Sequence, residues 1–168
     1  MNWMRTAAWL LVLLVATGAY FYYAGGGAGY FSLKEIGLKG GTRVPLVLPE
    51  GIAFGEDVPL GARAAISDKV AALRAAVEEN PSDAALWSKL AMQYSMAGDF
   101  ERCRAVWEHI LTLAPNDVIA LYSLGYLYQF RVRDESTAKD YYEAALAEAR
   151  KSGSPLEKSA RENLALIK

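Results

Sequence analysis

The sequence has very little of the residue types that carry metal and redox chemistry. Cysteine and histidine each occur once in 168 residues, as Cys103 and His109. A single cysteine cannot close an intramolecular disulfide, and the CxxC, CxxCH and paired Cys/His spacings of zinc or attached haem are absent. The two residues lie about 240° apart around one expected helix, so they cannot share a metal ion. We predict no metal site and expect Cys103 to be a buried core residue.

Neither sign of charge is in excess. The chain has 18 Lys and Arg against 19 Asp and Glu, and its basic residues form no block. Nucleic acid is bound through concentrated positive charge that neutralises phosphates. The sequence therefore predicts no nucleic-acid partner.

Carboxylates placed for catalysis are missing as well. Glu78 and Glu79 are consecutive, so on a helix their side chains point in different directions. Four aspartates fall where helices are expected to begin, and there aspartate accepts hydrogen bonds from free backbone N–H groups: Asp83, Asp99, Asp117 and Asp134. The glycine-rich residues 25–29 are not followed by the lysine of a phosphate-binding loop. We predict no catalytic residues, no cofactor and no enzyme activity.

The N-terminal part contains a long stretch without charge. No residue between Arg5 and Lys34 is charged, and Thr6–Tyr23 is apolar or weakly polar throughout. As a helix it would be about 27 Å long, close to the roughly 30 Å hydrocarbon core of a bilayer. Aromatic residues, favoured at membrane boundaries, lie toward both ends. We predict that residues 1–24 are an uncleaved single-span anchor; a cleaved signal peptide is the alternative, because Thr17–Ala19 offers small residues.

The charges flanking this stretch predict its orientation. Arg5 and the terminal amine are the only charges on its N-terminal side, which places the N-terminus in the cytoplasm under the positive-inside rule. The C-terminal domain would then lie outside the inner (cell) membrane, in the periplasm if the cell is a Gram-negative bacterium.

Residues 25–61 are rich in glycine and proline, and we predict an extended linker there. Prolines argue against a central strand, yet a disordered tether would contain fewer large apolar residues. We therefore expect this segment to lie on a surface, supplied either by its own helical domain or by another protein. The residues expected to dock are Val44, Leu46, Val47, Leu48, Ile52 and Phe54.

From residue 62 to residue 168 the pattern becomes helical. Ile66, Val70, Leu73 and Val77 recur at three- and four-residue steps, which is the spacing of one buried helical face, and Asn80-Pro81 ends the run. The breaks that follow predict further helices at about Ala84–Ala97, Phe100–Ala114, Val118–Arg131, Ser136–Lys151 and Pro155–Ile167.

Two of the expected helix pairs repeat at an offset of 34 residues. Four core positions of the first pair recur in the second: Trp87, Leu90, Ala91 and Tyr94 match Leu121, Leu124, Gly125 and Tyr128. The pattern resembles the tetratricopeptide repeat, W-x2-L-G-x2-Y with a closing proline, here Pro115. Residues 84–117 fit without gaps, and residues 118–151 fit with about one extra residue between Arg131 and Ser136.

This resemblance covers roughly the last 100 residues and implies the fold class. We expect an all-α, TPR-like helical repeat of about two and a half helix pairs plus a capping helix, preceded by one transmembrane helix and the extended linker. The helix before Pro81 resembles the second half of a degenerate first repeat, and residues 155–168 resemble the capping helix.

The resemblance also implies where a partner binds. In this family the first helices of successive pairs line a groove. Its positions carry over to Ser88, Lys89, Met92, Ser95 and Met96, and to Tyr122, Ser123, Tyr126, Gln129 and Phe130. Aromatic and methionine side chains suit an apolar helix or peptide, but the linker or the last helix of this chain could also fill the groove. The carboxylate-gripping variant of the family is not implied, since only Lys89 remains of its polar positions.

Two functions are consistent with these features. The first is a non-catalytic scaffold for protein–protein interaction, namely an accessory or assembly subunit of a respiratory, photosynthetic or secretion complex of the inner membrane. The alternative is a periplasmic chaperone-like peptide binder, similar to the TPR proteins of cytochrome c maturation.

Overall fold

The computed structural model describes residues 46–167, which form six α-helices and one short π-helix and contain no β-strand. The predicted anchor, the first part of the linker and Val44 lie outside the described residues. None of the helices in the described part is long and apolar enough to cross a membrane. The all-α prediction is therefore confirmed for residues 46–167.

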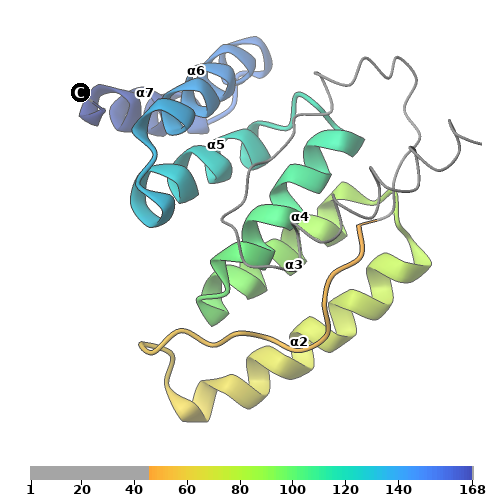
Figure 1. Cartoon of the computed structure of the whole chain (residues 1–168). Coiled ribbons are helices and arrows are strands. Elements are labelled where there is room, and N and C mark those ends of the chain that lie inside the picture. Colours follow the sequence, from red (N-terminus) through yellow and green to blue (C-terminus); the bar gives the residue numbers. More distant parts are fainter. Residues whose placement is uncertain (1–45, 168) are drawn as a thin grey trace, which may run out of the picture. The chain divides into compact units, whose positions relative to one another are not determined.

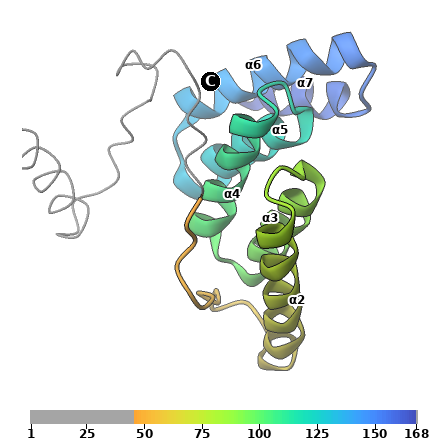
Figure 2. The ribbon, with the colours of Figure 1, turned by 90° about the vertical axis from the view of Figure 1, so that its right-hand side faces the viewer.

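Helices follow one another with short turns, and each packs on its neighbours in sequence (Figures 1 and 2). Their bounds are α2 Leu60–Glu79, α3 Ala84–Ala97, α4 Phe100–Leu113, α5 Val118–Leu127, η1 Tyr128–Val132, α6 Glu135–Ser152 and α7 Leu156–Leu166. The predicted bounds agree within two residues except at the end of α5, where the chain enters the π-helix.

The four aspartates that break the sequence pattern all cap helices. Their side-chain oxygens accept hydrogen bonds from backbone N–H groups in the first turns of α3, α4, α5 and α6: Asp83, Asp99, Asp117 and Asp134. Each cap satisfies a donor that the helix itself leaves unpaired. The caps therefore fix where each helix of the two pairs begins.

The extra residue of the second pair is absorbed by the π-helix η1. The α3 helix ends at Gly98, which is left-handed with φ 77°. In the second pair the chain makes a wider turn through Tyr128–Val132, and the left-handed position falls on Arg133 with φ 62°. A π-helix closes its hydrogen bonds over one more residue than an α-helix. The insertion thus lies in the helix rather than in the loop after it.

A small buried residue occupies the same core position in each pair. Ala91 and Gly125 occupy equivalent positions, and both are buried. A Cβ atom on Gly125 would lie 2.8 Å from two ring carbons of Tyr142, which is fully buried against it. The second pair therefore needs glycine where the first accepts alanine.

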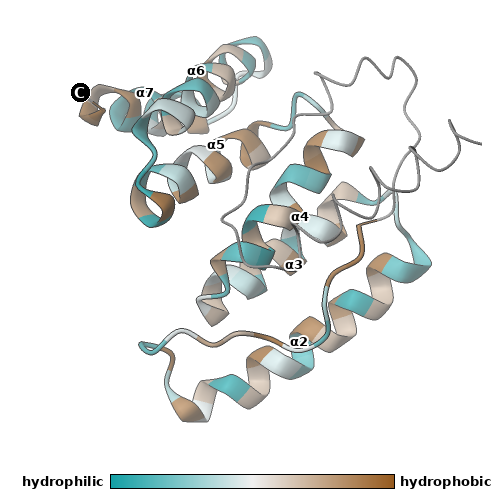
Figure 3. Cartoon of the chain, viewed as in Figure 1, coloured by the Kyte–Doolittle hydropathy of each residue, from teal (hydrophilic) through white to brown (hydrophobic). Residues whose placement is uncertain are grey.

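Residues 46–59, which we call the strap, form no regular structure but lie on the helices. The strap runs antiparallel to α2, because Arg74 donates to Leu48 O at 3.0 Å and Pro49 O at 2.8 Å, while Arg63 donates to Val58 O at 3.1 Å. In Figure 1 it is the orange trace beside α2. Figure 3 shows apolar colour along much of it.

The other edge of the strap contacts the turn between α3 and α4. The backbone N–H of Gly55 donates to Ala97 O at 2.8 Å, and that of Ala53 donates to Asp99 Oδ2 at 2.9 Å. A Cβ on Gly98 would come within 3.0 Å of the Gly55 Cα. Glycine at position 98 thus allows both the left-handed helix end and the close approach of the strap.

Candidate functional site

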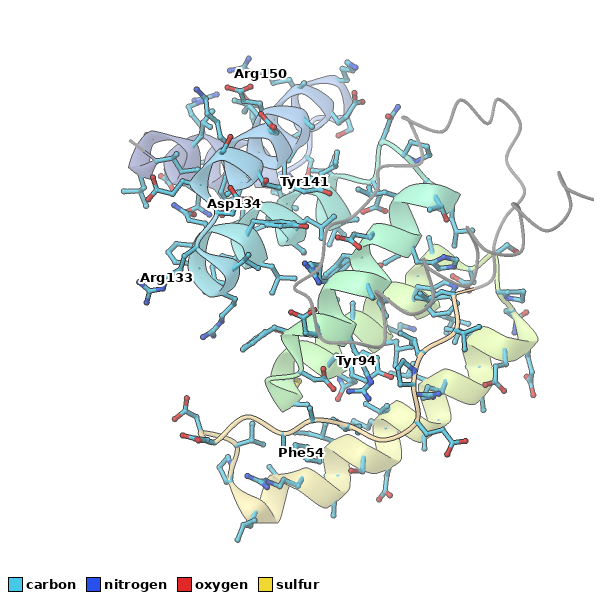
Figure 4. All side chains as sticks on the ribbon, in the orientation of Figure 1. Phe54, Tyr94, Arg133, Asp134, Tyr141 and Arg150 are labelled. Atoms are coloured by element: carbon cyan, nitrogen blue, oxygen red, sulfur yellow. The ribbon has the colours of Figure 1, made fainter. Side chains whose placement is uncertain are left out.

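Four of the six linker residues predicted to dock do so on the protein's own helices, whereas the prediction is wrong for Val47 and Val44 lies outside the described residues. Four of them pack, half-buried, against the core of α2, α3, α4 and α5: Leu46, Leu48, Ile52 and Phe54. Val47 between them points outward and is 84% exposed. Phe54 also lies under the guanidinium of Arg63, 5.3 Å from the ring centre, and Figure 4 shows it beneath α3 and α4 beside α2. The sequence left two docking surfaces possible, the protein's own helical domain or another protein. Residues 46–54 lie on the protein's own domain.

We call the ten predicted groove residues of α3, α5 and η1 the candidate face. Its α3 half is open: Lys89, Met92, Ser95 and Met96 are exposed, and Ser88 is half-buried with its hydroxyl donating to Ala84 O at 2.8 Å. Gln93 Nε2 donates to Met96 Sδ at 3.8 Å. Nothing in the described chain covers the two methionines.

The second half of the candidate face is partly engaged by neighbouring helices. Asn163 of α7 donates to the Tyr122 hydroxyl at 3.0 Å and to the Tyr142 hydroxyl at 3.2 Å. Tyr142 in turn donates to Gln129 Oε1 at 2.9 Å. Burial raises the pKa of Tyr142, so its hydroxyl stays a donor in this network. The final helix therefore covers Tyr122, as the sequence allowed, and Tyr142 of α6 holds Gln129, while Tyr126 and Phe130 stay exposed.

The residues left open lie at equivalent positions of the two pairs. Met92 is 48% exposed and Tyr126, 34 residues later, is 43% exposed. Met96 is 58% exposed, and its counterpart Phe130 is 43% exposed. The rings of Tyr126 and Phe130 touch, with their centres 4.6 Å apart. Large apolar side chains thus face solvent at the same two positions of both pairs.

The helices of the candidate face differ in charge from the rest of the described chain. Neither α3 nor the α5–η1 helix contains an Asp or Glu, whereas α2, α4, α6 and α7 all do. The charged residues of these face helices are Lys89 and Arg131, and Arg133 follows directly. Arg131 lies 4.2 Å from the centre of the Phe100 ring. The candidate face itself is therefore apolar with one positive charge, Lys89, and Arg131 and Arg133 follow it in the sequence.

A hollow lies at the end of η1. Its volume is about 470 Å³, and Gln129, Phe130, Arg133 and Glu135 line it. Figure 4 shows Arg133 extending away from the helices. Within the described part of the chain Arg133 forms no ion pair, and neither does Glu135. Sequence reasoning overlooked Arg133, because the 34-residue offset aligns Gly98 with Val132 and only the π-helix moves the left-handed position to Arg133.

Cys103 and His109 both lie within the packing of α4. Cys103 is buried, and burial raises the pKa of its thiol to about 12, so the nucleophilic thiolate does not form near neutral pH. The His109 ring meets Trp87 edge-on at 4.6 Å, and burial lowers its pKa. Residues 46–167 contain no group of three metal-ligating side chains. Cys103 belongs to the structural core, and His109 is half-buried against Trp87.

No protein-family model matches the chain, and no curated protein sequence matches it.

Proposed function

We propose that the protein is a non-catalytic scaffold that binds another protein through the candidate face. The observation that carries this proposal is the exposure of Met92, Met96, Tyr126 and Phe130 at equivalent positions of two helix pairs. Scattered exposed apolar residues are common on proteins, but a recurring set on two first helices is typical of a binding surface. Aromatic and methionine side chains are enriched at such surfaces.

We further propose that residues 60–166 are a tetratricopeptide-like repeat. Three features support it: the 34-residue offset, the matching aspartate caps, and the small buried residues Ala91 and Gly125 at the same position of each pair. The strap supports it too. It runs antiparallel to α2 along α3, which is the direction that the missing first helix of that pair would take.

The place of action that we propose follows from the N-terminal sequence. The uncharged stretch Thr6–Tyr23 is long enough for one membrane span, and the charges around it favour an N-terminus in the cytoplasm. The helical domain would then act in the periplasm as an accessory or assembly subunit of an inner-membrane complex. Intact mass of the protein purified from membranes tests the anchor, since a mature chain beginning near Tyr20 would refute it.

A second candidate function is transient binding of unfolded clients. Methionine side chains adapt to irregular apolar shapes and are used where one surface meets many ligands. Met92 and Met96 are the most adaptable part of the candidate face, which favours a chaperone-like peptide binder. Copurification in mild detergent separates the two: a subunit keeps a fixed stoichiometry with named partners, whereas a chaperone does not.

The scaffold proposal is tested by removing one aromatic anchor. Tyr126→Ala should lower the amount of copurified partner strongly, because truncating an aromatic anchor at an interface costs about 2 kcal/mol or more. The fold should lose little stability, since Tyr126 is 43% exposed. Leu60→Ala is the matched control: Leu60 is a large apolar residue that is 79% exposed at the start of α2, outside the face. Equal partner recovery from the two variants would remove the basis for the proposal.

A further inference from the structure

We propose that the hollow at the end of η1 is a subsite for a carboxylate, and that Arg133 binds a partner's acidic residue there while Phe130 contacts its apolar neighbour. The proposal rests on the proposed function, because the hollow adjoins the candidate face. It adds the chemistry of the partner: a peptide segment with an Asp or Glu close to a large apolar residue.

The backbone at Arg133 is the first observation that points to this role. Arg133 is the one non-glycine residue in the described chain with a positive φ. A side chain there makes the left-handed conformation unfavourable, and the equivalent turn of the first pair uses Gly98 instead. Arginine at this position therefore has a cost to the fold, and nothing within the described chain compensates it by an ion pair.

The charges around the hollow are the second observation. Two acidic residues follow Arg133, and neither forms an ion pair with it in the described chain. Asp134 caps α6: its Oδ1 accepts from the Thr137 backbone at 3.0 Å, and its Oδ2 accepts from the Thr137 hydroxyl at 2.6 Å. Glu135 lines the hollow but forms no ion pair with Arg133. The guanidinium thus keeps its five donors for a carboxylate, which it can bind in a fork.

The charge pattern also indicates which segment binds at the hollow and the candidate face. Both face helices lack carboxylates, so an acidic segment meets no like charge along α3 or α5. The 45 residues that precede the described chain contain one carboxylate, Glu35, against four basic residues. They match this surface poorly, because Lys89, Arg131 and Arg133 would repel them. A segment of another protein with negative charge fits it.

The experiment uses the full chain in detergent and a phage-displayed library of random 12-residue peptides. The wild type should select peptides with Asp or Glu within four residues of Phe, Leu or Trp. Arg133→Asn, which tolerates the left-handed backbone but has no charge, should lose the acidic preference. It should also bind a selected acidic peptide about tenfold more weakly. Glu135→Gln should bind that peptide more tightly, and Lys139→Gln on the outer part of α6 should leave binding unchanged.

A stability measurement gives an independent readout. Arg133→Gly should increase the folding equilibrium constant about fivefold in urea titrations while it weakens peptide binding, because glycine relieves the left-handed strain. A merely structural role for Arg133 would give the opposite sign for folding.

Other outcomes overturn the assignment. Apolar peptides selected without acidic residues would refute the carboxylate subsite alone, whereas equal, unenriched pools from the wild type and Tyr126→Ala would refute the candidate face itself. Binding to vesicles of anionic phosphatidylglycerol that depends on Arg133, with no acidic peptides selected, would assign the hollow to a lipid surface. Self-association lost in Arg133→Asn would assign it to a second copy of the chain.

Discussion

Replacing Asp99 by alanine separates the contribution of the strap from that of the helix caps. Asp99 is 3% exposed and has three partners. Its Oδ1 accepts from the Arg102 backbone at 3.3 Å, while its Oδ2 accepts from the Ala53 backbone at 2.9 Å and pairs with the Arg102 guanidinium at 2.5 Å. Asp117 is the matched control, because it caps α5 through Ala120 N at 2.8 Å and holds no part of the strap.

The expected loss of stability follows from these contacts. Removing an aspartate cap costs about 1 kcal/mol, which is the expected effect of Asp117→Ala. Asp99→Ala also leaves the Ala53 N–H without its acceptor and removes the carboxylate partner of the Arg102 guanidinium, which keeps only Glu50 O at 3.2 Å; together these losses add about 1 to 2 kcal/mol. We therefore expect Asp99→Ala to lower the free energy of unfolding by about 2 to 3 kcal/mol, at least twice the effect of the control.

Urea titration in detergent, followed by tryptophan fluorescence, measures both variants, since Trp87 and Trp107 are buried in the domain. Limited proteolysis adds a local readout: residues 46–59 should be cleaved faster in Asp99→Ala than in Asp117→Ala. Equal destabilisation together with equal cleavage would refute the reasoning, because the strap would then contribute nothing through Asp99.

Three further predictions concern the core. Gly125→Ala should destabilise the fold by about 2 kcal/mol in urea titration, since the new Cβ meets the Tyr142 ring at 2.8 Å; Gly61→Ala, with no atom within 4 Å of its Cβ, should not. The Cys103 thiol, whose pKa burial raises to about 12, should react with a thiol reagent only after unfolding, and rapid labelling of the native protein would contradict this. Burial lowers the pKa of His109 below the usual 6.5, so the folded state binds its proton less readily than the unfolded state. Stability should therefore be complete above pH 6.5 and fall as the pH drops toward the folded pKa. His109→Gln should reduce this slope, and an unchanged slope would count against it.

The helices of this domain could be predicted because their signals are local. Apolar spacing, the four aspartate caps and the breaks at Asn80-Pro81 and Pro115 act over a few residues. The predicted helix bounds were wrong by more than two residues only at the end of α5, where the chain enters the π-helix. An inserted residue can lengthen either a loop or a helix, and local propensity does not distinguish a π-helical turn from a longer connection.

The sequence predicted which residues form the candidate face, but it did not predict which of them are exposed and which are covered. The 34-residue offset placed Met92 with Tyr126 and Met96 with Phe130. That α7 covers Tyr122 through Asn163 depends on residues 41 positions apart in the chain. No spacing rule encodes such a contact, because it depends on how α6 and α7 pack against α5.

By itself, the sequence determined the all-helical character of residues 60–166, the start of each helix and the burial of Cys103, since periodicity and capping are properties of neighbouring residues. The tertiary structure alone decided that the strap lies on its own domain and that Arg133 takes the position of a glycine. The strap depends on groups from distant parts of the chain, since Arg74 of α2 and Asp99 of the turn between α3 and α4 both bind it. The position of Arg133 depends on the π-helix, which moves the left-handed conformation onto an arginine.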